Sequence, residues 1–555
     1  MQESSTVYNL RSLSLPKLYG ATLKLFRGLL TTPATRPLLL GSLLENGGIP
    51  KLRRIKLDEA PTFYPIGLGS SPATRVEAVS EPPAGKGNKP VAGPWSTIGE
   101  FTAAYRDKRT TPTEVAERFI AARDESQRRA IPLNAFIASY NEDIRAQAAE
   151  STQRIAEGRP RGPLEGVPIA VKDEVDMRPY PTTVGTSFLG GQPVARDAEA
   201  VARLRAAGAL LVGKTNMHEI GIYPNGSNVH YGRVANPRDP LRDSGGSSSG
   251  SAAAVGSGLV PAALGADGGG SIRIPSALCG LVGLKPGFGR ISERGAAPLC
   301  WSVAHLGPIA NSAEDAALLY SIMAGPDPEE PLTSGRGEVL AGEWRQTRLE
   351  GLRIGVDRAW SNHADAEMTA AHDALIEGLK SLGASIIPIA IPELDEMRIA
   401  HAVTILAEMA TAMSRWPEQA ARFADSTRMS LTLGSAMTSF DYLQAQKMRT
   451  RAMAIFSRIY EEVDLILSPG TAIPAPLVPQ AALSNGWSDL GTDTELMRYA
   501  FPANLTGLPA IVFPSGLSRD GLPLSVQAMS DWGDEHLLLR LAYASLRILP
   551  AAKGA

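Results

Sequence analysis

A stretch of glycine and serine at positions 245–286 carries the residue types that acyl-transfer chemistry needs. Its sequence is GGSSSGSAAAVGSGLVPAALGADGGGSIRIPSALCGLVGLKP. Gly268, Gly269 and Gly270 can approach a ligand closely, and their N–H groups can converge with that of Ser271 on an anion. Such a nest beside a serine hydroxyl predicts a nucleophile with an oxyanion hole. A plain glycine-rich turn stays as the alternative, whereas a phosphate loop would require a lysine that is missing here.

A serine nucleophile needs a base, and Lys172 is the candidate. None of the seven histidines has an esterase context, and Ser271 lacks the GxSxG pattern of a nucleophile elbow. Lys172 ends the apolar run of residues 167–171, which predicts a buried strand. Burial favours a neutral amine that can accept a proton. The alternative is a lysine at a strand end that pairs with Asp173 or Glu174.

Four segments of the chain resemble the amidase signature family in both order and spacing. They are GPLEGVPIAVKDEVD at 162–176, GKTNMHEIG at 213–221, GGSSSGS at 245–251 and GADGGGSIRIP at 265–275. The resemblance covers roughly residues 96–545. It implies an α/β fold with a large mixed β-sheet sandwiched between helical layers, and a serine hydrolase that cleaves amides.

The family resemblance also implies a proton relay through three side chains. Lys172 would accept a proton from Ser247, and Ser247 would accept one from Ser271. The 24 positions between the two serines match the family's spacing. In that family the bridging serine follows a cis peptide bond, which here is the bond between Gly246 and Ser247.

The glycine-rich segment also matches the family around the nucleophile. Asp267 and Arg273 stand at family positions, and we expect them to shape the loop. Ser249, Ala266 and Gly287 depart from the usual pattern without removing a catalytic group. The form GxDGGGSxRIPSALCG resembles the plant-type fatty acid amide hydrolases, which implies N-acyl amides such as N-acylethanolamines as substrates.

A long acyl chain would need an apolar tunnel. The candidates for lining it are Met217, Tyr223, Trp301 and Met529, each of which could equally be ordinary core. Two alternatives stay open for the function. One is the A subunit of a glutamyl-tRNA amidotransferase, although about 95 residues precede the core here and that protein begins almost directly with it. The other is an amidase for small aliphatic or aromatic amides.

Composition limits the partners. The 555 residues carry a net charge of −2, which gives no reason to expect nucleic acid. The two cysteines, Cys279 and Cys300, exclude a disulfide framework, and no metal pattern or cofactor motif is present, so we expect no metal and no cofactor. We find no signal peptide and no transmembrane segment, and expect a cytoplasmic or peripherally membrane-associated enzyme.

The chain divides into four predicted parts: an N-terminal helical extension at 1–65, an extended connector at 66–95, the catalytic domain at 96–545 and a tail at 546–555. Ser96 or Thr97 could cap a first helix of the catalytic domain. Short apolar strands then alternate with helices. We predict helices at 201–207 and 368–382, and strands at 209–212, 354–356, 386–391, 465–468 and 510–513.

The N-terminal extension contains two apolar segments, residues 16–30 and 37–44. The first has leucines at helical spacing with lysine and arginine among them. Together they predict a helical hairpin with an apolar face. It could face a membrane or form a homodimer, or it could pack on its own enzyme.

Overall fold

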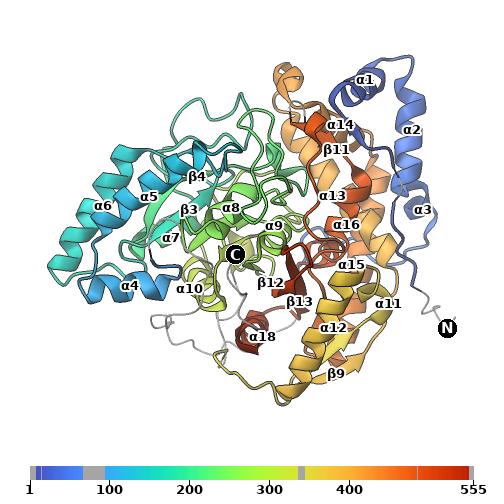
Figure 1. Ribbon diagram of the computed structural model, residues 1–555. Coiled ribbons are helices and arrows are strands. Elements are labelled where there is room, and N and C mark those ends of the chain that lie inside the picture. Colours follow the sequence, from blue (N-terminus) through green and yellow to red (C-terminus); the bar gives the residue numbers. More distant parts are fainter. Residues whose placement is uncertain (1–7, 14, 67–93, 335–343, 484–485, 549–555) are drawn as a thin grey trace.

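The computed structural model describes residues 8–13, 15–66, 94–334, 344–483 and 486–548. These residues form an 11-stranded sheet in which parallel and antiparallel pairs are mixed (Figure 1). The order across it is β2 (Phe136–Ala138), β4 (Leu210–Thr215), β3 (Pro168–Lys172), β5 (Ala262–Ala266), β7 (Leu306–Ala310), β6 (Val282–Lys285), β12 (Ala510–Leu517), β13 (Pro523–Ser530), β10 (Leu465–Pro469), β8 (Arg353–Val356) and β9 (Ser385–Pro388). The predicted α/β class with a large mixed sheet is confirmed.

Both faces of this sheet are covered by helices. Successive side chains of a strand point to opposite faces, so a strand that is apolar throughout must be covered on both. In β3, Ile169 and Val171 join one apolar cluster, and Ala170 joins another on the opposite face. The first face is covered by α4 (Ile98–Arg106), α7 (Glu199–Ala206), α10 (Ala313–Met323), α12 (Ala366–Ser381) and α18 (Glu535–Ile548). The second is covered by α5 (Pro112–Gln127), α6 (Asn141–Ala156), α8 (Ser249–Gly256), α13 (Leu394–Met413), α15 (Ser439–Glu462) and α17 (Phe501–Thr506).

The elements predicted from the sequence are present, with shifted ends. Thr97 rather than Ser96 caps α4, and it accepts a hydrogen bond from the Glu100 N–H. The strand predicted at 386–391 is shorter and ends at Pro388, although the Ile389 N–H still donates to the Val356 carbonyl at 3.2 Å. The remaining helices are α9 (Arg273–Cys279), α11 (Arg358–Ser361), α14 (Asp425–Gly434) and α16 (Leu490–Met497), with short 3-10 turns at Glu219–Gly221, Pro331–Thr333, Pro417–Arg422 and Gln480–Ala482.

The N-terminal extension is helical, as expected. A short strand, β1 (Leu18–Tyr19), pairs with β11 (Trp487–Ser488) and leads into α1 (Gly20–Thr31), α2 (Arg36–Gly47) and α3 (Ile49–Arg54). Leu23 and Leu30 of α1 are buried against Met429 of α14. Leu25 and Leu38 are 65% and 79% exposed. The hairpin therefore packs one side on its own chain and presents leucines on another.

The predicted connector at 66–95 lies almost wholly outside the described residues, as do positions 549–555 of the predicted tail. The four domain boundaries accordingly stay predictions. Within the described ranges, no helix has the length and apolarity needed to cross a membrane.

Candidate active site

Ser271 lies in the loop between β5 and α9, where close packing explains the preceding glycines. A Cβ added to Gly268 would lie 2.8 Å from the Sγ of Cys300, closer than such atoms approach. Gly270 has a φ of 118°, in the region that favours glycine. The loop therefore needs residues without side chains to bring the Ser271 backbone into its place.

The N–H groups of this loop divide into one that is engaged and three that are available. The Gly270 N–H donates to Asp267 Oδ1 at 2.7 Å. Across the described part of the chain, the N–H groups of Gly268, Gly269 and Ser271 donate to no protein acceptor. Of the four N–H groups predicted to form an oxyanion hole, that of Gly270 already donates to Asp267; the oxyanion hole itself stays a prediction.

Lys172 ends β3 with its amine surrounded by acceptors, and its side chain is 1% exposed. The amine donates to Ser247 Oγ at 2.9 Å and to the Ala266 carbonyl at 3.3 Å. It also lies 2.7 Å from Glu174 Oε2, in an ion pair that the sequence kept open as an alternative. The two interpretations of Lys172 are therefore compatible, since one amine contacts both Ser247 and Glu174.

Ser247 and Ser271, the predicted bridging and nucleophilic serines, lie on neighbouring segments. The Gly246–Ser247 peptide bond is cis, as the resemblance implies. The Ser248 N–H donates to the Ser271 carbonyl at 3.2 Å, which joins the two segments. No hydrogen bond joins the hydroxyls of Ser247 and Ser271 among the residues that the structure describes. The second step of the relay stays a prediction.

Asp267 and Arg273 form a buried ion pair near the predicted nucleophile Ser271, with Arg273 Nε 3.1 Å from Asp267 Oδ2. Arg273 also donates to Gln527 at 2.6 Å and to Asn504 at 2.5 Å. Burial opposes ionisation of Asp267, but the charges of Arg273 and Lys285 and the bond from Asn504 outweigh it and hold the pKa of that carboxyl well below its usual value. Asp267 therefore stays ionised, and its carboxylate accepts hydrogen bonds from N–H groups of the loop.

His401 of α13 is a part of the site that the sequence did not reveal. Its Nε2–H donates to the Gly268 carbonyl at 2.8 Å, across 133 positions of the chain. Burial lowers the pKa of His401 to about 4, so the ring is neutral near pH 7. No motif surrounds His401, and only the packing of α13 against the loop gives it this role.

The four predicted lining residues lie in different surroundings. A Cβ added to Gly221 would lie 3.2 Å from Ser247 Oγ and 3.8 Å from Met217 Cε, so Met217 lies close to the relay. Tyr223 is buried, and its hydroxyl accepts from Ser430 at 2.9 Å. Trp301 is half-buried beside Cys300. Met529 of β13 belongs to the core cluster under α13, α15 and α17. Of the four, Met217 is the one that shares a neighbour, Gly221, with Ser247.

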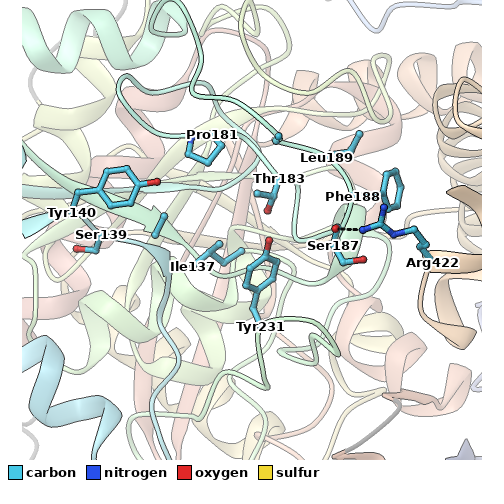
Figure 2. A pocket seen from close by; sticks show the side chains of 13 residues that line it. Ile137, Ser139, Tyr140, Pro181, Thr183, Ser187, Phe188, Leu189, Tyr231 and Arg422 are labelled. Atoms are coloured by element: carbon cyan, nitrogen blue, oxygen red, sulfur yellow. Dashed lines mark hydrogen bonds between the residues drawn. The ribbon is translucent and has the colours of Figure 1, made fainter.

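An apolar cluster lies next to the relay and extends towards α13 and α14. We call it the active-site apolar cluster; its buried members are Val184, Met217, Ile220, Leu299, Cys300, Val303, Met409, Met413 and Phe423. A surface cavity of about 680 Å³ opens beside β2 (Figure 2). Phe188 and Leu189 both line this cavity and pack against the cluster. Arg422 closes one side of it by donating to the Ser187 carbonyl.

Comparisons with known proteins agree with this geometry. The family model described as Amidase matches residues 114–539. The chain is 36% identical over 579 residues to a fatty acid amide hydrolase from Medicago truncatula, covering 99% of this chain and 95% of that relative. It is 33% identical over 473 residues to the A subunit of a glutamyl-tRNA(Gln) amidotransferase from Coxiella burnetii, covering 80% and 96%.

A solved structure of an amidase superposes with a TM-score of 0.72 at 32% identity, covering 81% of this chain and 99% of that one. The family match and this superposition confirm the resemblance drawn from the four sequence segments. The similarity to plant fatty acid amide hydrolases is confirmed as well, over nearly the full length. The chain therefore belongs to the amidase family and is a hydrolase of amide carbon–nitrogen bonds.

Proposed function

We propose that this enzyme cleaves fatty acid amides such as N-acylethanolamines, through a relay of Lys172, Ser247 and Ser271 and an acyl-enzyme on Ser271. The observation that carries the relay is the contact of 2.9 Å between the buried Lys172 amine and Ser247 Oγ. A buried amine with a hydroxyl acceptor can take up a proton from that hydroxyl.

In the proposed reaction, Ser271 Oγ attacks the amide carbon while its proton passes to Ser247 and the proton of Ser247 passes to Lys172. The free N–H groups of Gly268, Gly269 and Ser271 would bind the resulting oxyanion. The proton would return through Ser247 to the leaving amine, and water would then hydrolyse the acyl-enzyme by the same path.

Two observations support a long acyl chain. The active-site apolar cluster adjoins the relay through Met217 and the nucleophile loop through Cys300. The relatives named fatty acid amide hydrolase align over almost the whole chain, whereas the amidotransferase protein covers 80% of it. Each buried CH₂ contributes about 0.8 kcal/mol, so a long chain bound along such a cluster would bind tightly.

The exposed leucines of α1 and α2 support a contact of the hairpin beyond its own chain. Leu25, Leu29 and Leu38 are exposed on helices whose other side is packed on α14. Such leucines suit a membrane surface, from which lipid-like amides could enter, or a second copy of the chain in a homodimer.

The test is the rate of the purified chain on ethanolamides with acyl groups from acetyl to oleoyl, next to acetamide and benzamide. We expect kcat/KM to rise with chain length and Ser271→Ala to abolish every rate. If acetamide or benzamide outperformed every ethanolamide, the small-amide alternative would replace this proposal. If amide hydrolysis required added partner proteins and tRNA, the amidotransferase alternative would replace it.

A further inference from the structure

Glu174 is the acidic partner of the proposed base and lies on a fixed backbone. It follows Lys172 by two positions and is 6% exposed. The neighbouring loop runs antiparallel to it, with a bridge between Val175 and Ala296. The Ala297 N–H donates to the Glu174 carbonyl at 2.9 Å. Pairing with this loop holds the backbone at Glu174, and its carboxylate lies 2.7 Å from the Lys172 amine.

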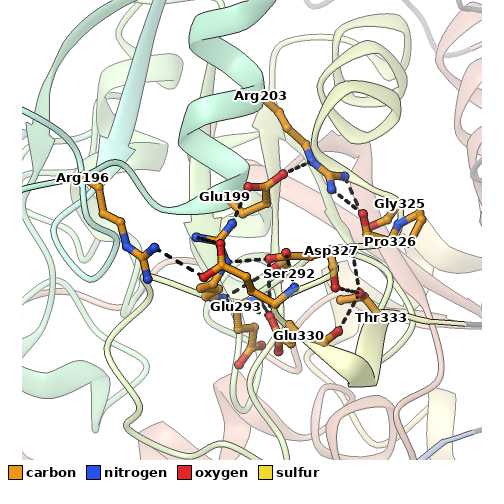
Figure 3. Close-up of polar contacts among 12 residues, drawn as sticks. Arg196, Glu199, Arg203, Ser292, Glu293, Gly325, Pro326, Asp327, Glu330 and Thr333 are labelled. Carbon is orange, nitrogen blue, oxygen red and sulfur yellow. Dashed lines mark hydrogen bonds and ion pairs between the residues drawn. The ribbon is translucent and has the colours of Figure 1, made fainter.

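The loop that covers Glu174 is itself anchored by an ionic network (Figure 3). The Glu293 N–H donates to Glu330 Oε2 at 2.7 Å, and the Ser292 hydroxyl lies 2.7 Å from both Asp327 Oδ2 and Glu330 Oε2, to either of which it can donate. Arg294 Nε lies 2.8 Å from Asp327 Oδ2. These contacts anchor the loop whose Ala296 and Ala297 pair with the backbone of Val175 and Glu174.

Other titratable groups surround the pair from separate segments. They are His218 after β4, and Glu293 and Cys300 in the covering loop; Glu408 of α13 in turn acts on Glu293 and Cys300. Burial lowers the pKa of His218 to about 4. Burial and the neighbouring carboxylates raise the pKa of Glu293 and of the Cys300 thiol well above their usual values.

Two further acids have partners of their own. Burial raises the pKa of Glu408, which accepts from Ser302 and Tyr442. Asp173, although adjacent in sequence, pairs with Lys214 at 3.2 Å. Glu174 is the carboxylate in direct contact with the Lys172 amine, at 2.7 Å, whereas Asp173 and Glu408 contact other groups.

We propose that Glu174 is a positioning residue of the relay, which aims the Lys172 amine at Ser247 and stabilises the ammonium formed when the proton arrives. The inference rests on the proposed function. Ser271 gives its proton to Ser247, and Ser247 gives its own proton to Lys172. The positive charge formed on Lys172 lies 2.7 Å from the Glu174 carboxylate. The arrangement does for a lysine what a buried aspartate does for the histidine of a serine protease.

The ion pair has two effects of opposite sign. It stabilises the ammonium that follows proton transfer, which favours acylation. It also stabilises the ammonium in the resting enzyme, where the relay needs a neutral amine, so activity begins at a higher pH. Removal of the charge at 174 should shift the rising limb of the pH–rate profile to lower pH by about 1 to 3 units, the range typical of a close opposite charge.

The test compares pH profiles of kcat/KM for hydrolysis of oleoylethanolamide by four proteins: the wild type, Glu174→Gln, Glu174→Asp and Glu117→Gln. Glu117 forms a half-exposed ion pair of 2.6 Å with Arg145 and provides the matched control. We expect the limb of Glu174→Gln to move to lower pH and its plateau rate to fall. In Glu174→Asp the rising limb should lie at the same pH as in the wild type, with a lower plateau of kcat/KM. Glu117→Gln should match the wild type in both.

An unmoved limb in Glu174→Gln, or a limb moved to higher pH, would overturn the inference. If Glu174→Gln does not fold, Glu174→Asp decides the question. This variant keeps a carboxylate, so a rising limb displaced by about 1 to 3 pH units would also overturn the inference. Failure of the proposed function is separate, since it would show as a wild type inactive on the ethanolamide or as full activity in Ser271→Ala.

Discussion

At the scale of single residues, the proposed chemistry depends on three side chains that pass one proton between them. Because Lys172, Ser247 and Ser271 act as a unit, each alanine variant should lose at least about a thousandfold in kcat. A double variant should lose little more than the single ones, since the effects of a unit do not add. Steady-state kinetics on an N-acylethanolamine measure both quantities.

The control for these variants is Ser249→Ala. Ser249 follows Ser247 closely at the start of α8, and its buried hydroxyl has no hydrogen-bond partner within the described residues. It should retain activity close to the wild type. Losses that simply multiplied in the double variants, or a Ser271→Ala protein with about a tenth of wild-type activity, would contradict a shared relay.

The residues of the site differ in how far sequence could reveal them. Lys172, Ser247 and Ser271 stand in short motifs with family spacing, so each could be named in advance. Glu174 could be named only as one of two possible partners for Lys172. His401 could not be named, because a lone histidine in an amphipathic helix gives no sign of a contact 133 positions away.

At the scale of elements, α13 supports the nucleophile loop through His401. Replacement by leucine would remove the donor to the Gly268 carbonyl while keeping an apolar side chain in the buried position. We expect kcat to fall by roughly 10- to 100-fold as the Gly268–Gly269 peptide loses its orientation, with KM little changed. Steady-state kinetics and a thermal melt of the same protein measure this.

The conservative variant His401→Gln supplies an N–H donor and should recover part of the loss. An equal fall in both variants, accompanied by an equally lowered melting temperature, would indicate that His401 only fills space in the core.

The hairpin of α1 and α2 is a second element with a testable role. Serine at Leu25, Leu29 and Leu38 changes exposed side chains and leaves the buried contacts of α1 intact. We expect weaker association with lipid vesicles or with a second copy, and a lower rate on oleoyl than on acetyl ethanolamide. Vesicle sedimentation, light scattering and kinetics measure these effects.

Serine at Leu241 and Leu477, which are 58% and 61% exposed elsewhere on the molecule, provides the control. If the hairpin variant matched the wild type in vesicle binding, in mass in solution and on long chains, the hairpin would serve packing alone.

The predicted elements also show where sequence patterns reach their limit. The apolar run before Lys172 predicted β3 correctly, because a strand covered on both faces is apolar throughout. The order of strands across the sheet could not be read from it. β12, for example, lies between β6 and β13, and its pairing with β6 joins segments more than 200 positions apart. Such pairings depend on packing of the whole chain.

At the scale of the whole molecule, buried carboxyls link stability to pH. Burial raises the pKa of Asp243 from 3.8 to about 6, against the bonds from the Gly226 and Gly245 N–H groups. A raised pKa means that the folded state binds the proton more tightly. Its contribution to stability is full below the unfolded value and is lost as pH rises through about 6.

Asp243→Asn keeps an oxygen that can accept those two bonds and removes the ionisation. The unfolding free energy of the variant minus that of the wild type should therefore be about 2 kcal/mol larger at about pH 8 than at about pH 4.5. Urea unfolding of both proteins at the two pH values measures the difference. If the difference in unfolding free energy between the two proteins were the same at both pH values, ionisation of Asp243 would not contribute to the pH dependence of stability.

The residues that hold the site in place lie far from its motifs in the sequence. Arg273 lies in a motif, but its partner Gln527 is 254 positions away on β13. The sequence predicted that Arg273 shapes the loop without indicating what holds Arg273. Only the assembled sheet brings β13 next to α9, so that Gln527 can accept from Arg273, whose charge lowers the pKa of Asp267.

The central claim is that Ser271 carries the acyl group during turnover. The most direct measurement is mass spectrometry of enzyme quenched in acid during turnover of oleoylethanolamide, followed by peptide mapping. We predict an added oleoyl mass on the peptide that contains Ser271, and none in Ser271→Ala. An oleoyl group mapped to a different residue would contradict the account. So would turnover without detectable acylated enzyme under conditions in which the acyl-enzyme forms faster than it is hydrolysed.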